Sequence, residues 1–276
     1  MIYTAGELKL LLKEHDIRIK KRLGQNFLID NNQVKRIITA SDVNNEDLVL
    51  EIGPGLGALT DELSLACKKF VAIEFDRDLY SLLKEHFSGY KNTEIIHGDI
   101  LKYKFEAKSK VIGNLPYYIT SPIIAYLIDN RKYIDTAYLT IQKEVAERLV
   151  ARPGIKSYGS LSCFVQFYCV PKILFSISKK AFYPRPAVES CLVKLEFLKE
   201  PAVEVTDEDL FFKIIKAVFG QRRKILLNAL LGSNMFNIEK SKFNNILLSL
   251  KINPKRRGET LSLQEFANIQ EKVSQL

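Results

Sequence analysis

Residues 48–60 read LVLEIGPGLGALT, an apolar run followed directly by a glycine-rich turn. Gly53, Gly55 and Gly57 carry no β-carbon, so the backbone can turn sharply there and lie against a ligand. Apolar residues at helical spacing begin at Ala58. A strand, a glycine loop and a helix in this order predict the start of a parallel α/β sheet, with a ligand site at the end of its first strand.

The first two-thirds of the chain repeats this alternation. Short runs rich in Val, Ile and Tyr predict strands, and apolar residues at helical spacing predict the helices between them. The expected strands are 47–52, 69–74, 93–97, 110–114 and 136–142, and the expected helices are 58–68, 77–87 and 122–130. This order predicts an α/β fold with a mostly parallel, doubly wound sheet covered on both faces. A later run, 191–197, is expected to close one edge.

The pattern becomes wholly helical after Pro201. Helical spacing runs over 207–219, 222–231, 238–250 and 263–273. Thr206, followed by three acidic residues, is typical of a helix start with Thr206 as the N-cap. We therefore expect two domains, an α/β domain over residues 1–203 that includes a helical N-terminal segment 1–40, and a small all-helical domain over residues 204–276.

The overall composition is that of a globular protein with a basic surface. The chain has 276 residues, 47% of them hydrophobic and 26% charged, and a formal net charge of +9. This length accommodates one large and one small domain. The positive charge favours an acidic partner, with nucleic acid ahead of an anionic membrane surface.

Other sequence features indicate where in the cell the protein is expected and whether it is expected to bind a metal. The four cysteines and three histidines show no spacing typical of zinc ligands, so we expect no metal centre. The first sixteen residues, MIYTAGELKLLLKEHD, resemble a charged amphipathic helix and lack the apolar core of a signal peptide. No run approaches the ~20 apolar residues that span a bilayer. We expect a cytoplasmic protein without a membrane partner.

Polar side chains stand at the ends of the other predicted strands. The second strand ends in Glu74, the third is followed by Asp99, and the fourth ends in Asn114. Ligands of open α/β sheets bind along the carboxyl ends of the strands. These side chains are therefore expected to line one crevice.

A nicotinamide cofactor is one candidate for that crevice, because Gly53-x-Gly55-x-x-Ala58 also satisfies the dinucleotide-binding pattern. Such an oxidoreductase would use Glu74 for a ribose. It would not require Asp99 or the sequence NLPY after the fourth strand, and no hydride-transfer motif is present. Titration with NAD(P) tests this possibility.

The ordered motifs resemble those of S-adenosylmethionine-dependent methyltransferases that act on an exocyclic amine. E-x-G-x-G-x-G, the acidic end of the second strand, the Asp after the third and N-L-P-Y after the fourth carry this resemblance. Four further segments are similar to the KsgA-type small-subunit rRNA adenine N6,N6-dimethyltransferases. They are LGQNFLID (23–30), FYPRPAVES (182–190), FGQRRKILLNAL (219–230) and RRGETLSLQEF (256–266), and the match spans about residues 20–270.

The resemblance implies a Rossmann-like class I methyltransferase with S-adenosyl-L-methionine as methyl donor and S-adenosylhomocysteine as product. Glu74 would accept hydrogen bonds from the ribose hydroxyls, and Asp99 would accept one from the cofactor adenine, with Ile100 packed on that ring. In full, the expected cofactor residues are Asn26, Leu28, Gly53, Gly55, Glu74, Asp99, Ile100 and Asn114. The segment around Asn26 is also expected to be a helix-entry turn, with Asp30 as the N-cap of the next helix.

The NLPY sequence is the expected catalytic element. The Asn114 side-chain oxygen and the Leu115 carbonyl would hold the hydrogens of the target amine, and Pro116 would keep the turn rigid. Tyr117 would stack on the target base, and Phe182 would form the opposite aromatic wall. A purely structural interpretation instead places Phe182 in the core.

The implied substrate is a pair of adjacent adenosines near the 3′ end of small-subunit (16S-type) rRNA, in an immature small ribosomal subunit, and we expect a monomer. Candidate RNA contacts are three basic triplets, whose alternative interpretation is solvated helix faces: Lys20, Lys21 and Arg22; Arg222, Arg223 and Lys224; and Lys255, Arg256 and Arg257. Two other functions stay open: an antibiotic-resistance methylase of large-subunit rRNA, and a non-catalytic ribosome assembly factor.

Overall fold

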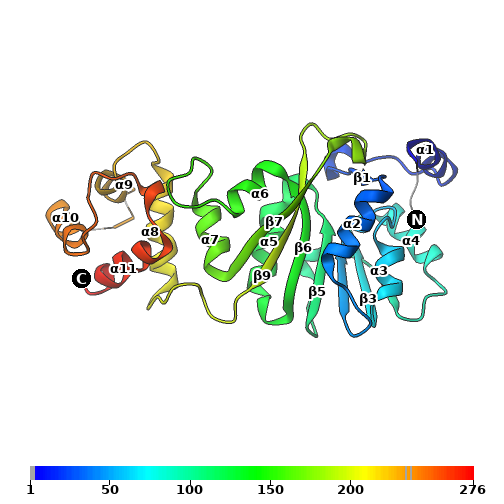
Figure 1. Cartoon of the computed structure of the whole chain (residues 1–276), viewed down its shortest axis with the longest axis horizontal. Helices are drawn as coiled ribbons and strands as arrows, with labels where there is room; N and C mark the ends of the chain where they lie inside the picture. Colours follow the sequence, from blue (N-terminus) through cyan, green and yellow to red (C-terminus); the bar gives the residue numbers. More distant parts are fainter. Residues whose placement is uncertain (1–3, 234, 237) are drawn as a thin grey trace. The chain divides into compact units, whose positions relative to one another are not determined.

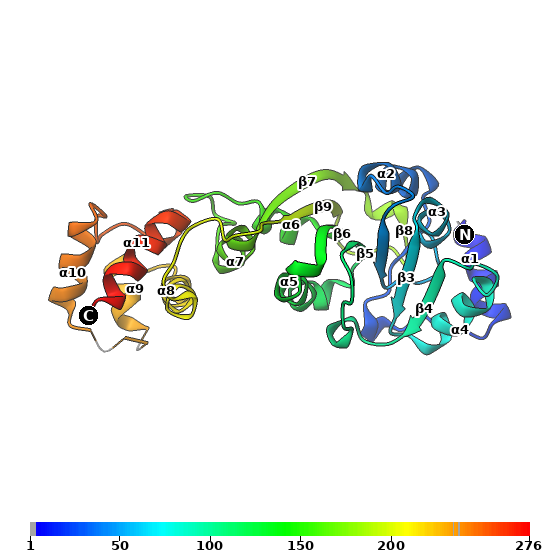
Figure 2. The ribbon, with the colours of Figure 1, turned by 90° about the horizontal axis from the view of Figure 1, so that it is seen from below.

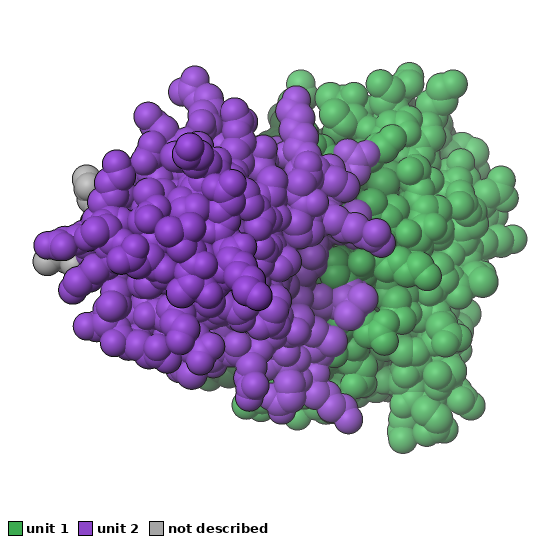
Figure 3. All heavy atoms as spheres, turned by 60° about the vertical axis from the view of Figure 1, so that its left-hand side comes forward, with its two compact units in different colours: residues 1–146, 171–197 green, residues 147–170, 198–276 purple. Residues whose placement is uncertain are grey.

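The computed structural model describes residues 4–233, 235, 236 and 238–276. Its contacts divide the chain into two compact units, shown in Figure 3. Unit 1 is Met1–Ala146 with Pro171–Phe197, and unit 2 is Glu147–Val170 with Leu198–Leu276. The chain passes between the units three times, and the expected domain boundary after residue 203 lies close to the last passage, between Phe197 and Leu198. The membership of Glu147–Val170 in unit 2 was not predicted from the sequence pattern.

A seven-stranded sheet with the order β4-β3-β2-β5-β6-β9-β7 forms the centre of unit 1 (Figure 1). The pairs β2–β3, β3–β4, β2–β5 and β5–β6 are parallel, and β6–β9 is antiparallel. The mostly parallel sheet is therefore confirmed. Its strands are β2 (Leu48–Ile52), β3 (Lys69–Glu74), β4 (Thr93–His97), β5 (Ser109–Asn114), β6 (Ile134–Gln142), β7 (Cys169–Ile177) and β9 (Ser190–Phe197).

The direction in which strands are added reverses beside β2. The chain passes from β2 outward to β3 and β4, and it then returns to place β5 and β6 on the other side of β2. Ile52 of β2 lies opposite Gly113 of β5. The residues that follow them, Gly53 and Asn114, therefore emerge together at the switch point, where open α/β sheets bind their ligands.

Helices cover both faces of this sheet, as expected. Helices α2 (Asn31–Ser41) and α3 (Thr60–Ala66) lie on one face and α5 (Thr120–Asp129) on the other (Figures 1 and 2). The carboxylate of Asp30 accepts hydrogen bonds from the backbone N–H groups of Asn32 and Gln33, which confirms Asp30 as the N-cap of α2. A fourth helix, α4 (Arg77–His86), starts directly after β3.

The N-terminal segment is held beside the glycine loop. After α1 (Ala5–Glu14), the short strand β1 (Phe27–Leu28) pairs antiparallel with β8 (Phe182–Tyr183). Phe27 is buried in a small apolar cluster with residues of α1 and α4 and with Leu56 of the glycine loop. Burial of this cluster fixes the position of residues 23–29.

Unit 2 is mainly helical over its described residues, and only Cys169 and Val170, the first residues of β7, belong to a strand. Its helices are α7 (Ser160–Tyr168), α8 (Glu208–Gly220), α9 (Leu226–Gly232), α10 (Lys240–Ser249) and α11 (Leu263–Ser274), and α6 (Lys143–Leu149) leads into it from β6. Phe167 of α7 packs on Phe211 and Phe212 of α8, with ring centroids 4.9 and 5.2 Å away. These rings account for the grouping of α7 with the C-terminal helices.

Three local predictions were wrong. The edge strand is β7, which had not been predicted, and β9 lies between β6 and β7. The N-cap of α8 is Asp207, because the hydroxyl and N–H of Thr206 are instead bonded to the Gln270 side chain. Residues 222–225 lie in a turn before α9, since Ile225 pairs as an isolated β-bridge with Arg257.

No helix among the described residues has both the length and the apolar character needed to cross a membrane.

The close approach of β2 and β5 makes Gly113 sensitive to substitution. A Cβ at Gly113 would lie 3.0 Å from the Ile52 carbonyl oxygen and 3.1 Å from the Ile52 Cβ. We expect Gly113→Ala to lower the free energy of unfolding by about 1–3 kcal/mol, because the crowding atom is backbone that cannot rotate away. Urea unfolding measures this change.

Gly89→Ala is the matched control, because no heavy atom lies within 4 Å of a Cβ built there. Equal urea midpoints for the two variants would contradict the expectation.

Candidate active site

A single pocket at the carboxyl ends of β2, β3 and β5 collects most of the predicted site residues. Its lining includes every predicted cofactor residue and four of the five predicted catalytic residues. Those lining residues are Asn26, Leu28, Gly53, Gly55, Glu74, Asp99, Ile100, Asn114, Leu115, Pro116 and Tyr117. The fold therefore brings together side chains that are up to about ninety positions apart in the sequence.

The glycine loop forms one wall of the pocket. Gly53, Gly55 and Gly57 have φ values of +65°, +62° and +79°, a region that side-chain-bearing residues rarely adopt. A Cβ at Gly55 would lie 3.1 Å from the Phe27 ring. The loop backbone can therefore line the pocket without β-carbons, while the N-terminal segment packs closely on it at Gly55.

Glu74, at the end of β3, places a carboxylate at the pocket wall. Its side chain is nearly buried, with 6% of the residue exposed. One oxygen accepts the N–H of Gly55 at 3.0 Å, and the other accepts the N–H of Asp76 at 2.8 Å. Burial raises the pKa of Glu74 to about 7, against the opposing effect of these hydrogen bonds. Each oxygen can accept a further hydrogen bond, as two ribose hydroxyls would require.

Asp99 and Ile100 lie at the end of β4. Asp99 Oδ1 accepts the N–H of Leu101 at 3.0 Å, and this contact fixes the carboxylate at the start of a 3-10 turn. The carboxylate retains the capacity to accept from an amine. Ile100 is buried and offers an apolar surface in the same pocket.

The amide of Asn114 has a defined orientation. Its Nδ2 donates to the Asn26 backbone carbonyl at 2.9 Å. A carbonyl can only accept, so this contact assigns the nitrogen to Asn26 and leaves Oδ1 as the acceptor end of the amide. Next to it, the N–H of Leu115 donates to Thr140 of β6 at 3.0 Å. The turn that follows β5 is thereby anchored at both residues.

Tyr117 and Phe182, the two expected aromatic walls, lie in different environments. Tyr117 is half-buried in the pocket lining, and its hydroxyl is 2.8 Å from the hydroxyl oxygen of Ser190. Phe182 is only 3% exposed and lies in the main apolar core, outside the pocket lining. Phe182 pairs with Leu28, which lines the pocket, and its role as the opposite aromatic wall stays a prediction.

Glu51 and Phe75 are among the lining residues that had not been assigned roles from the sequence. Glu51, the first residue of the E-x-G-x-G-x-G motif, is buried and accepts the Thr60 hydroxyl at 2.7 Å. Burial raises the pKa of Glu51 to about 8. Phe75 follows Glu74, lines the pocket and is 57% exposed. The motif position was the available signal for Glu51, whereas nothing in the sequence marks Phe75.

The basic triplets divide into engaged and exposed residues. Arg222 donates to the carbonyls of Lys156 and Tyr158 at 2.7 and 3.0 Å and pairs with Glu259. Arg256 pairs with Glu265 at 2.5 Å. Lys20 lies between two carboxylates, described below. Arg222 is nevertheless exposed, and the other exposed members are Lys21, Arg22, Arg223, Lys224, Lys255 and Arg257.

The strand order, the glycine loop and the acidic residues after β3 and β4 together define a Rossmann-like methyltransferase of the S-adenosylmethionine-dependent class. Residues 17–269 match the family model described as ribosomal RNA adenine dimethylase. The chain belongs to this family, and the alternative of a nicotinamide oxidoreductase is not supported.

Relatives of similar length support the assignment of the chain to this family. The chain is 42% identical to ribosomal RNA small subunit methyltransferase A of Alkaliphilus metalliredigens, over 99% of this chain and 98% of the relative. It is 44% identical to the protein of the same name from Moorella thermoacetica, over 97% of each.

Solved structures agree with the fold. A dimethyladenosine transferase from Plasmodium falciparum is 29% identical with a TM-score of 0.79, covering 90% of this chain and 98% of that one. The 23S rRNA methyltransferase ErmE has a TM-score of 0.71 at 23% identity, covering 90% of this chain and 100% of that one, a likeness that concerns the fold alone.

The pocket fits S-adenosylmethionine by the chemistry of its lining. The missing β-carbon of Gly53 leaves open space along the backbone, and the nearly buried carboxylate of Glu74 can accept further hydrogen bonds from hydroxyl donors. Ile100 supplies an apolar surface beside the acceptor Asp99. These residues would hold the methionine part, the ribose and the adenine, respectively.

The raised pKa of Glu74 predicts a pH-dependent affinity for the cofactor product. Ribose hydroxyls donate to the ionised carboxylate, so binding is strongest where Glu74 is already ionised, above pH about 7. Below that pH we expect the affinity for S-adenosylhomocysteine to fall by up to about tenfold per pH unit. Calorimetric titration across this range measures it.

Glu51, with a pKa of about 8, also titrates in this pocket. Glu74→Gln should bind more weakly and lose only the step near pH 7. A step of unchanged size in that variant would contradict the assignment to Glu74.

Proposed function

We propose that this protein transfers methyl groups from S-adenosylmethionine to the exocyclic N6 of two adjacent adenosines near the 3′ end of small-subunit rRNA. The single observation that carries the chemistry is the orientation of the Asn114 amide by the Asn26 carbonyl. The substrate class follows from the family and from near full-length relatives named small subunit methyltransferases.

The acceptors after β5 would activate the amine by holding its hydrogens. The lone pair of an adenine N6 is delocalised into the ring, so the nitrogen is a poor nucleophile. Asn114 Oδ1 and the Leu115 carbonyl would accept its two hydrogens and favour a pyramidal nitrogen with a localised lone pair. Pro116, with φ −59°, keeps these acceptors in a fixed relation.

Positioning can supply much of the rate. When bound, S-adenosylmethionine offers a methyl group on a positively charged sulfur that is a good leaving group. Alignment of two reactants is worth about 7–11 kcal/mol in favourable systems. Tyr117 would stack on the base, with its ring held in place by the contact to Ser190. The proton that the alkylated nitrogen must lose can pass to solvent.

Asn114→Ala tests this assignment. We expect methyl transfer to fall by about a hundredfold or more, because the amine loses an acceptor and its alignment. Binding of S-adenosylhomocysteine should change by only a few-fold, because the other cofactor residues are intact. The measurements are single-turnover methyl transfer and calorimetry.

Asn45→Ala, an exposed amide beyond α2, is the matched control and should behave as the wild type. Undiminished transfer by Asn114→Ala would refute the proposed role.

The substrate itself is tested by comparing three acceptors. Labelled methyl groups should enter small subunits that lack the modification, in preference to naked small-subunit rRNA and to large-subunit rRNA. Transfer to large-subunit rRNA would instead support the resistance methylase, and transfer to none of the three would support a non-catalytic assembly factor. We place this reaction in the cytoplasm, on an immature small subunit, and infer that a monomer performs it.

We infer that unit 2 binds RNA through its exposed basic residues. Arg223 and Lys224 in the turn before α9 and Arg257 opposite that turn are exposed, and the Ile225–Arg257 bridge brings the two segments together. Lys21 and Arg22 in unit 1 are further candidates. Arg222 and Arg256 serve mainly to hold unit 2 together, by the ion pairs given above.

Single substitutions distinguish these roles. Arg223→Gln, Lys224→Gln and Arg257→Gln should each weaken RNA binding and lower the slope of log affinity against log salt by about 1, because one phosphate contact is lost. Filter binding at several salt concentrations measures the slope.

Lys108→Gln is the control, since Lys108 is an exposed lysine of unit 1 paired with Asp135. Equal slopes for the control and the three variants would remove these residues from the RNA surface.

A further inference from the structure

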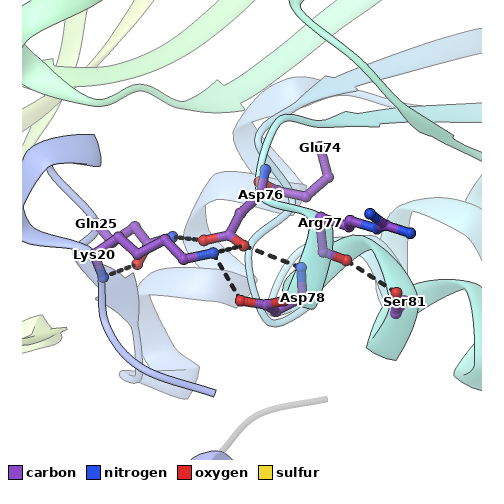
Figure 4. Close-up of polar contacts among 7 residues, drawn as sticks. All are labelled: Lys20, Gln25, Glu74, Asp76, Arg77, Asp78 and Ser81. Atoms are coloured by element: carbon purple, nitrogen blue, oxygen red, sulfur yellow. Dashed lines mark hydrogen bonds and ion pairs between the residues drawn. The ribbon is translucent and has the colours of Figure 1, made fainter. Parts of the chain in front are cut away.

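Lys20, Gln25 and Asp76 form a closed polar cluster at the rim of the pocket (Figure 4). Lys20 Nζ lies 2.5 Å from Asp76 Oδ1, and Gln25 Nε2 donates to Asp76 Oδ2 at 2.7 Å. The N–H of Lys20 donates to Gln25 Oε1 at 2.7 Å, which closes the ring. Lys20 also contacts Asp78 at 2.7 Å.

Asp76 is the centre of this cluster, and its charge is compensated there. Its side chain is 1% exposed, and besides Lys20 and Gln25 it accepts the N–H of Asp78 as the N-cap of α4. Burial raises the pKa of Asp76, but the bonds from Lys20, Gln25 and Asp78 together outweigh burial and leave it below its usual value. The carboxylate therefore stays ionised and depends on these donors.

A backbone hydrogen bond links the cluster to the carboxylate of Glu74, the residue expected to bind the cofactor ribose. The N–H of Asp76 donates to Glu74 Oε1 at 2.8 Å, two residues earlier in the chain. Glu74 and Asp76 therefore share one short loop after β3, which shows in Figure 4 as the connection into α4. Asp76, the acceptor of Lys20 and Gln25, is therefore joined directly to Glu74 by this hydrogen bond.

The cluster is linked on its other side to the catalytic amide. Gln25 directly precedes Asn26, whose carbonyl accepts Asn114 Nδ2 at 2.9 Å. Asn26 Nδ2 in turn donates to the Gly24 carbonyl at 2.9 Å, which stiffens the segment. A continuous path of hydrogen bonds and two short peptide segments therefore runs from Glu74 through Asp76, Gln25 and Asn26 to Asn114.

We propose that Lys20, Gln25 and Asp76 are positioning residues, a latch that holds residues 20–28 on the pocket and couples cofactor binding at Glu74 to the orientation of the Asn114 amide. This inference rests on the proposed function of the pocket. It gives Lys20 a role other than the RNA contact expected from its place in a basic triplet. Because coupling between two sites is reciprocal, a loosened latch weakens cofactor binding as well as catalysis.

The central test is Lys20→Met, which removes the ammonium and keeps the length of the stem. We expect the dissociation constant for S-adenosylhomocysteine to rise by about tenfold, within the range typical of site-to-site coupling. Lys20→Arg, which keeps a cation, should restore most of the affinity. Amide hydrogen exchange in residues 20–28 of the ligand-bound protein should be faster in Lys20→Met than in the wild type.

Coupling is separated from general destabilisation by a double-mutant cycle with Glu74→Gln. If the latch acts through Glu74, the two losses of affinity combine to less than their product. Gln25→Ala, which leaves every charge in place, is a second probe and should also weaken binding. Lys108→Met is the matched control, because it removes a lysine from the exposed pair with Asp135.

The outcomes distinguish the two levels of inference. Wild-type protein that fails to bind S-adenosylhomocysteine would refute the proposed function of the pocket itself. Wild-type binding with Lys20→Met and Gln25→Ala both equal to Lys108→Met would refute the latch alone. The latch would also be refuted if the loss of affinity in the double variant equalled the product of the losses in Lys20→Met and Glu74→Gln. Lys20 would then act independently of Glu74.

Discussion

The reversal of strand order between β2 and β5 is the constraint on which the site depends. It opens a crevice at the carboxyl edge of the sheet, into which the glycine loop, Glu74 and Asn114 all emerge. The register that pairs Ile52 with Gly113 fixes how closely the two strands approach, and a β-carbon at Gly113 would crowd Ile52. Glu74, expected to bind the cofactor, ends β3, and Asn114, expected to accept from the target amine, ends β5. The hydrogen-bonded sheet holds the two residues in a fixed relation.

Buried carboxylates at this edge are unfavourable alone and are compensated locally. Glu51 relies on the Thr60 hydroxyl, Glu74 on two backbone N–H groups, and Asp76 on a lysine, an amide and a helix N-terminus. The first two have raised pKa values and the third a lowered one, because only Asp76 has a cation at hand. A ligand with hydroxyl donors would complete the compensation at Glu74. This difference in compensation is the physical reason why Glu74 suits ligand binding, whereas Asp76 suits holding residues 20–28 in place.

Local sequence signals were sufficient for much of the fold and for the cofactor side of the pocket. Strands β2 to β6 have the apolar, β-branched character that marks a parallel sheet, and the glycine loop and Asp30 N-cap have specific backbone causes. Strand β7 was missed because Pro171 and Lys172 interrupt its apolar run and, at the edge of the sheet, most of its residues are only partly buried or exposed. Thr206 was misassigned because its hydroxyl has a distant partner, Gln270, that no local pattern reveals.

The sequence by itself determined the class of fold, the family and the set of residues at the strand ends, because these depend on periodicity and on motifs with a local mechanism. Only the tertiary structure decided which side chains are committed to one another. It paired Lys20 with Asp76 across more than fifty residues, turned the Asn114 amide toward Asn26, and placed Phe182 in the core. Such choices depend on burial and on which donor reaches which acceptor, and both arise only when distant segments are packed together.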